Sequence, residues 1–116
     1  MHDSTIFHEE EMLQRLQQDR EVARLIIENF IDDIPKQLLK LNDAIKEGSA
    51  EDIHLKAHAI KGAALMVGGN MLSRAAKDLE MAARSDNLQQ ADRLFEVMQE
   101  QFFLLKNRLE VSGWIN

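Results

Sequence analysis

Apolar residues repeat at helical spacing through most of the sequence. The longest regular stretch runs from Arg20 to Glu47, where apolar residues follow one another at intervals of three and four: Ile27, Ile31, Ile34, Leu38, Leu41 and Ile45. This spacing is typical of a helix with one face toward a core. Asp19 stands where an N-cap is expected. Pro35 lies inside the stretch, and we expect it to bend the helix near Ile31 to Ile34 or to divide it in two.

Glycine and capping residues separate four further predicted helices. Their expected ranges are about 7–18, 50–67, 70–84 and 88–111. Gly48 ends the long helix, and Ser49 is placed to cap the next one. Asn70 is the expected N-cap of the fourth helix and Asn87 that of the fifth. Residues 113–116 are expected to form a tail.

These elements predict an all-α fold in one domain, residues 1–116. A chain of 116 residues is long enough for a single core. Short connections between long amphipathic helices favour antiparallel neighbours, so we expect an up-down four-helix bundle over about residues 20–111. The short additional N-terminal helix, about residues 7–18, is expected to cover one end of the bundle.

Composition and charge exclude several classes of protein. The sequence has no cysteine, which rules out disulfides and thiolate metal sites. Its net charge of −6 argues against a protein that binds nucleic acid through the phosphate backbone. No apolar run approaches the roughly 20 residues of a membrane-spanning helix, and the N-terminus shows no secretory signal. We therefore expect a cytoplasmic protein that binds no membrane.

The third predicted helix has an unusual outer face. Its core stripe consists of Ile53, Ala57, Ile60, Ala64 and Val67. With roughly 100° between successive residues, His58 points away from this stripe and should face solvent. Leu55, Gly62 and Leu65 lie on the same outer side, where a solvated helix normally carries charged or amide residues. Glycine inside a helix costs about 1 kcal/mol relative to alanine. A partner that approaches closely beside His58 would account for it.

Glu80 is expected to lie level with His58. The turn between the third and fourth helices centres near Gly69, and each of these two residues is eleven positions from it. In an antiparallel pair both should stand about 16 Å from the turn, at a rise of about 1.5 Å per residue. The Glu80 carboxylate can then accept the Nδ1–H of His58, which leaves Nε2 unprotonated and nucleophilic. Lys61 can offer positive charge to an incoming phosphoryl group.

The sequence lacks the parts that would transfer phosphate from a nucleotide. No Walker-type glycine loop, kinase signature or aspartate-rich magnesium site is visible. A phosphoryl group on His58 would therefore come from another protein, which would also contribute the metal.

Two other interpretations stay open at this point. His54 and His58 are spaced to chelate zinc with Glu80 as a third ligand, although Leu55 stands where a catalytic zinc helix carries glutamate. A helical docking module without phosphate is the other interpretation. Its docking face would consist of Ile26, Phe30, Leu55 and Leu65.

The residues around His58 also match a known pattern. The segment AHAIKGAA, residues 57–64, is followed by Gly68-Gly69, Leu72 and Leu79-Glu80. Together with residues 30–35, FIDDIP, it resembles the signature of histidine-containing phosphotransfer (HPt) domains. The resemblance extends over about residues 7–109.

The resemblance implies a phosphocarrier of a two-component phosphorelay, without kinase activity of its own. His58 would accept a phosphoryl group from a receiver-domain aspartate or a histidine kinase and pass it to another receiver. Lys61 would assist, Glu80 would hydrogen-bond the imidazole, and Gly62 would leave room for the partner. The expected protein is a monomer without cofactor or metal, which takes Mg²⁺ from its receiver partner. A hybrid sensor histidine kinase is a further candidate partner. The receiver is expected to dock on Ile26, Phe30, Leu55, Gly62 and Leu65.

Overall fold

The structure, a computed structural model, describes residues 5–116 and is helical, with no strand in that range. Residues 1–4 of the predicted domain lie outside the described residues. The helices are α1 (Glu9–Arg15), α2 (Arg20–Glu47), α3 (Ala50–Met66), α4 (Asn70–Arg84) and α5 (Ala91–Val111). The prediction of an all-α fold is confirmed.

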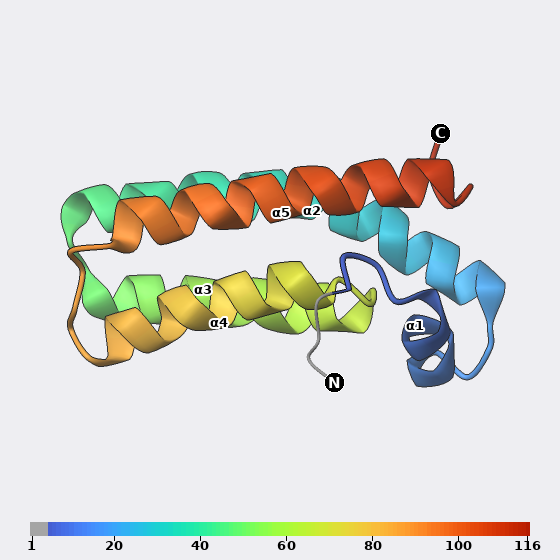
Figure 1. Ribbon diagram of the computed structural model, residues 1–116, viewed down its shortest axis with the longest axis horizontal. Coiled ribbons are helices and arrows are strands. Elements are labelled where there is room, and N and C mark those ends of the chain that lie inside the picture. The colour runs from blue at the N-terminus through green and yellow to red at the C-terminus, as the bar shows by residue number, and fades with distance from the viewer. Residues whose placement is uncertain (1–4) are drawn as a thin grey trace.

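Helices α2 to α5 form the predicted four-helix bundle. Each of these helices packs against its neighbours in the chain, and α2 and α5 close the bundle by packing on each other. Figure 1 shows α2 and α5 as one layer and α3 and α4 as the other. The α2–α3 and α4–α5 connections lie at one end of the bundle, and the α3–α4 turn lies at the other end beside α1. The short N-terminal helix therefore covers one end, as expected.

Helix α2 begins and ends at the predicted residues. The Asp19 side chain accepts a hydrogen bond from the Val22 amide at 3.1 Å, and Gly48 ends the helix in the left-handed conformation, with φ of 69°. Pro35 lies inside the helix without interrupting it, so the alternative of two separate helices is wrong. Most of the apolar stripe is buried, whereas Ile31 and Ile45 are only partly covered.

Helix α1 is shorter than predicted at both ends. Its N-cap is His8, whose Nδ1 accepts a hydrogen bond from the Glu11 amide at 3.3 Å. After Leu16 the backbone leaves the helical conformation, because Gln17 and Gln18 adopt positive φ values of 56° and 63°. A residue other than glycine rarely adopts this conformation, and the sequence gives no sign of it.

Two predicted N-caps are wrong. Asn70 is the first residue of α4 rather than its cap, and its side-chain Nδ2 donates to Glu11 Oε1 at 3.3 Å. Helix α5 begins at Ala91, three residues later than expected, and its N-cap is Gln90 rather than Asn87. The first turns of α4 and α5 therefore lack a hydrogen bond from a capping side chain.

The C-terminal residues do not form a free tail. Trp114 is 1% exposed, and its indole Nε1 donates to Glu9 Oε1 at 2.6 Å. The Arg20 and Arg24 guanidinium groups lie 4.8 and 5.5 Å from the centre of the ring. Residues 113–116 follow the last helix as predicted, but they pack against the beginning of α1 and α2 instead of extending into solvent.

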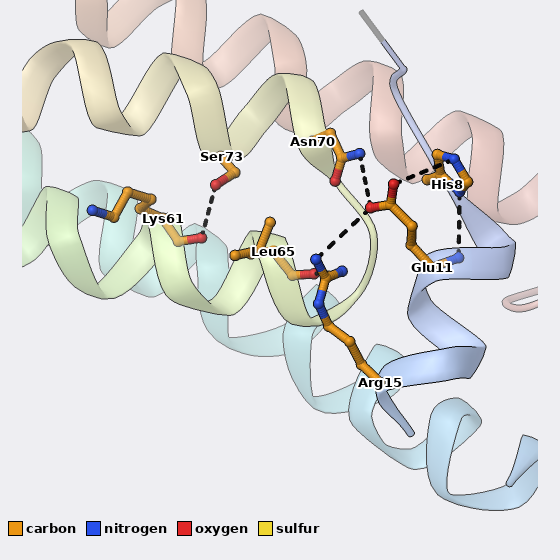
Figure 2. A network of polar contacts seen from close by, with 7 residues as sticks. All are labelled: His8, Glu11, Arg15, Lys61, Leu65, Asn70 and Ser73. Carbon is orange, nitrogen blue, oxygen red and sulfur yellow. Dashed lines mark hydrogen bonds and ion pairs between the residues drawn. The ribbon is translucent and has the colours of Figure 1, made fainter. Parts of the chain in front are cut away.

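Polar contacts attach α1 to the α3–α4 turn. Arg15 donates to the Leu65 carbonyl at 3.0 Å, and Glu11 accepts from Asn70, as Figure 2 shows. The His8 amide donates to the Gly68 carbonyl at 2.8 Å. Gly68 has φ of +77°, and a Cβ there would lie 2.5 Å from the His8 carbonyl oxygen. The turn therefore requires glycine for both its conformation and its close contact with His8.

Candidate functional site

His58 lies in the middle of α3 on the outer surface of the bundle. Its side chain is 62% exposed. The residues that form the core stripe of α3 are all buried: Ile53, Ala57, Ile60, Ala64 and Val67. The helical periodicity thus gave the correct direction for the histidine ring, because the buried stripe fixes the rotation of α3.

Glu80 is a buried carboxylate beside the exposed imidazole. It comes from α4 at the height expected from the hairpin, and its side chain is 8% exposed. Glu80 Oε2 lies 2.7 Å from His58 Nδ1, and Glu80 Oε1 lies 2.8 Å from Lys61 Nζ. The predicted contact between carboxylate and imidazole is present. The bond between Lys61 and Glu80 was not foreseen.

The charge of Glu80 fixes which nitrogen of His58 carries the proton. Burial raises the pKa of the Glu80 carboxyl, but the hydrogen bonds and charges of Lys61 and His58 outweigh it, so that this pKa lies below its ordinary value. The carboxylate is then ionised at neutral pH and can only accept hydrogen bonds. His58 Nδ1 must therefore donate, which leaves the lone pair of a neutral ring on the outward-facing Nε2.

The backbone near Lys61 is tied to α4. The Ser73 hydroxyl donates to the Lys61 carbonyl at 3.2 Å, as Figure 2 shows. Ser73 is itself buried. This bond and the Lys61–Glu80 ion pair join the two helices on either side of the histidine. The hairpin therefore presents His58 from a supported surface rather than from a loose helix.

Apolar side chains and an open glycine surround His58. Leu55 is 57% exposed and Leu65 is 41% exposed. A Cβ at Gly62 would have no heavy atom within 4 Å, so this glycine is not required for packing inside the bundle. Met66 and Met81 add further exposed apolar surface that the sequence analysis did not assign to the site.

The predicted docking residues of α2 lie along a groove between α2 and α3. Ile26 and Phe30 line it together with Gly62 and Met66. Phe30, however, is only 5% exposed, and its ring packs against Phe102 with the centroids 6.0 Å apart. Phe30 is mainly a core residue, which offers little surface to a partner.

His54 also reaches the carboxylate. Its Nε2 lies 3.4 Å from Glu80 Oε2, and its ring is nearly parallel to that of His58, at 16° with 6.2 Å between the centroids. The sequence alone suggested His54 only as a zinc ligand. Within the described residues, no group of three or more histidine, cysteine, aspartate and glutamate side chains is arranged to hold a metal ion. Both histidines therefore lie beside one carboxylate, His58 at hydrogen-bond distance and His54 at ion-pair distance.

The chain resembles known proteins over most of its length. A family model described as the Hpt domain matches residues 25–111. The crystal structure of histidine-containing phosphotransfer protein B from Pseudomonas aeruginosa is 23% identical, with a TM-score of 0.86 over 95% of this chain and 96% of that one. The HPT domain of a sensor hybrid histidine kinase from Shewanella is 14% identical, with a TM-score of 0.72 over 90% and 94%.

At these identities the two structures support the fold alone. A search of curated proteins found no match. None of the helices formed by residues 5–116 combines the length and apolar character that crossing a membrane requires.

Proposed function

Because the chain belongs to the Hpt domain family, the histidine phosphotransfer modules of two-component phosphorelays, we propose that His58 is the residue that carries the phosphoryl group. The observation that supports this assignment is the bond of 2.7 Å between His58 Nδ1 and the buried Glu80 carboxylate. It orients an exposed imidazole with its unprotonated nitrogen toward solvent. His54, whose ring lies 6.2 Å from that of His58, is only 32% exposed on its side chain.

The transfer step follows from this geometry. The Nε2 lone pair of His58 attacks the phosphorus of an aspartyl phosphate on a receiver domain. A P–N bond forms as the P–O bond to the aspartate breaks, and the aspartate carboxylate leaves with the electron pair. His58 Nδ1 keeps its proton, so the ring becomes cationic while it donates to Glu80. The adjacent carboxylate stabilises that cation, as an orienting carboxylate does in other nucleophilic sites.

Lys61 supplies the positive charge for the phosphoryl group in this proposal. Its ammonium is 2.8 Å from Glu80 Oε1 and sits on a flexible four-carbon stem, one helical turn from His58. The in-line geometry and the Mg²⁺ come from the receiver, because phosphoryl transfer needs charge neutralisation that one lysine does not provide. The protein itself would need no nucleotide site and would have no kinase activity.

The receiver would dock on the face around His58. Ile26, Leu55, Gly62 and Leu65 support this proposal, because they combine apolar surface with open space beside the histidine. Phe30 would contribute indirectly, by supporting the groove from the core. We further propose that the protein acts as a monomer in the cytoplasm, where receiver domains would reach this face directly.

Labelling with a phosphorylated receiver tests the assignment. The parent protein and His58→Gln are incubated with the phosphorylated receivers of the source organism, and protein-bound phosphate is measured after acid and after alkali. Phosphohistidine is labile in acid and stable in alkali, so we expect acid-labile label on the parent and none on H58Q. His8→Gln, which replaces the N-cap histidine of the covering helix, is the matched control and should label like the parent.

The same proteins, with receiver binding and metal content measured as well, distinguish the alternative functions. Label that persists on H58Q would show that another residue carries the phosphate. If the parent binds a receiver but takes no label from it, the helical docking module without phosphate is the better description. Metal that copurifies with the parent and is lost in H58Q would support a metal site instead.

A further inference from the structure

The Glu80 carboxylate lies within ion-pair distance of three basic side chains, His54, His58 and Lys61. Glu80 Oε2 accepts from His58 Nδ1 at 2.7 Å and also lies 3.4 Å from His54 Nε2. Glu80 Oε1 binds Lys61 Nζ at 2.8 Å. His54 lies one helical turn before His58, with 32% of its side chain exposed, and Glu80 is the acidic group that the described residues bring within ion-pair distance of it. The proposed transfer step uses His58, Glu80 and Lys61 but gives His54 no part.

Lys61 has two competing partners once the phosphoryl group arrives. A phosphoryl group on His58 carries close to two negative charges at neutral pH, compared with one on Glu80, so it attracts the ammonium more strongly. When Lys61 turns toward the phosphoryl group, Glu80 loses its partner on Oε1. A carboxylate that is 8% exposed needs other donors to stay ionised and in place.

We propose that His54 is a positioning residue, which holds Glu80 against His58 when Lys61 turns to the phosphoryl group. His54 Nε2 lies 3.4 Å from the same oxygen that His58 uses, so a proton on this nitrogen would keep the carboxylate turned toward the reacting ring. His54 does not touch the phosphoryl group and acts only through Glu80. This inference rests on the proposed role of His58 as phosphoryl acceptor.

A double-mutant cycle between His54 and Lys61 tests the shared role. The variants are His54→Leu, Lys61→Gln and the two combined, and the reaction is phosphorylation by phosphoramidate, a small donor that requires no docking. We expect H54L alone to slow phosphorylation by about 3- to 10-fold, the range for one net hydrogen bond. In the K61Q background, the His54→Leu change should slow phosphorylation by a larger factor than it does in the parent. Glu80 then has neither Lys61 nor His54 as a partner, so the combined effect exceeds the product of the two single effects.

Two further variants separate donation from packing. His54→Gln puts an amide N–H near the position of the imidazole Nε2, so it should restore the rate of the parent. Lys56→Gln, a change of charge on the same helix at a residue that pairs with Asp52, should react like the parent. The ¹⁵N chemical shifts of the His58 ring report its tautomer directly. In H54L/K61Q these shifts should show that the proton no longer stays on Nδ1.

The outcomes are distinct. Equal rate ratios for H54L in the parent and K61Q backgrounds, with unchanged His58 shifts, would overturn the role of His54. A rate for H54Q as low as that of H54L would also overturn it, since the donor would then be irrelevant. If the parent itself takes no phosphate on His58, the proposed function fails, whereas the ring shifts of the variants still test whether His54 positions Glu80. Circular dichroism establishes that each variant is folded, and His54→Ala replaces H54L if the leucine disturbs the helix.

Discussion

Replacement of Gly62 tests whether this glycine serves docking rather than folding. It lies inside α3 with a Cβ position that faces open space, so alanine can be added without a clash. Because glycine in a helix interior is less favourable than alanine by roughly 0.5–1 kcal/mol, Gly62→Ala should raise the free energy of unfolding by that amount. For a domain of this size the melting temperature should rise by about 2–6 °C. Gly62→Leu should also fold, since leucine is a good helix former.

The docking effect should run in the opposite direction. The leucine side chain would project beside His58 into the space left for a partner, so we expect G62L to weaken binding to a cognate receiver by at least about tenfold, or roughly 1.4 kcal/mol. Thermal unfolding measures the first effect and calorimetric titration with the receiver measures the second. Loss of stability in G62A would mean that the glycine supports the bundle internally. Binding of G62L as tight as that of the parent would show that no partner approaches this position.

Four further predictions concern Glu80, two glycines and the C-terminus. Glu80→Ala should slow phosphorylation of His58 by about 10- to 100-fold, the range for a hydrogen bond to a charged group, but should leave the bundle folded, as measured by transfer kinetics and circular dichroism. Because the folded-state pKa of Glu80 is depressed, its stabilising contribution is present above its ordinary value of 4.5 and is lost as the pH falls through the folded value. As the pH falls below 4.5, the free energy of unfolding measured by urea titration should therefore decrease more for the parent than for Glu80→Gln. Equal decreases would contradict the ion pairs of Glu80. Gly68→Ala should destabilise the protein by more than the approximately 1–2 kcal/mol of a left-handed residue, because of the clash with His8. Gly48→Ala, with φ of +69° and open space, should lose only that strain, and similar losses in both variants would rule out the clash. Trp114→Ala should cost about 3–5 kcal/mol in urea unfolding if the indole is core, whereas a small change would mean that it is peripheral.

The parts of the fold that local chemistry determines were predictable. Helix α2 has a capping side chain at Asp19, a left-handed glycine at Gly48 and a regular apolar stripe, and its bounds were predicted correctly. The bounds of α1 were predicted wrongly, because Gln17 and Gln18 adopt positive φ values and no glycine in the sequence indicates this conformation. The burial of Trp114 was also missed, since it depends on a contact with Glu9 at the other end of the chain. No local pattern records such a contact.

In the candidate site, too, the features set by helix geometry were predictable and those set by side-chain packing were not. Periodicity gave the outward direction of His58, and counting from the turn gave its contact with Glu80, because a helical hairpin has a fixed rise. The ion pair of Lys61 with Glu80 was not predicted, and His54 was placed near Glu80 only as a zinc ligand, since these contacts depend on the rotamers of side chains at the flanks of α3. Phe30 was expected on the docking face, but packing against Phe102 takes most of its ring into the core.

The short helix α1 contacts the turn of the α3–α4 hairpin, whereas the histidine site lies farther along the same two helices. Seven residues are too few for a helix that is stable alone, so α1 depends on its bonds to the hairpin turn and to Trp114. Its amides should exchange with solvent through local opening, at a much lower free energy than those of α3 and α4. His58 and Glu80 lie about three turns of helix from that turn. The covering helix can therefore open and close without loosening the imidazole from its carboxylate, and the reactivity of the site is insulated from this motion.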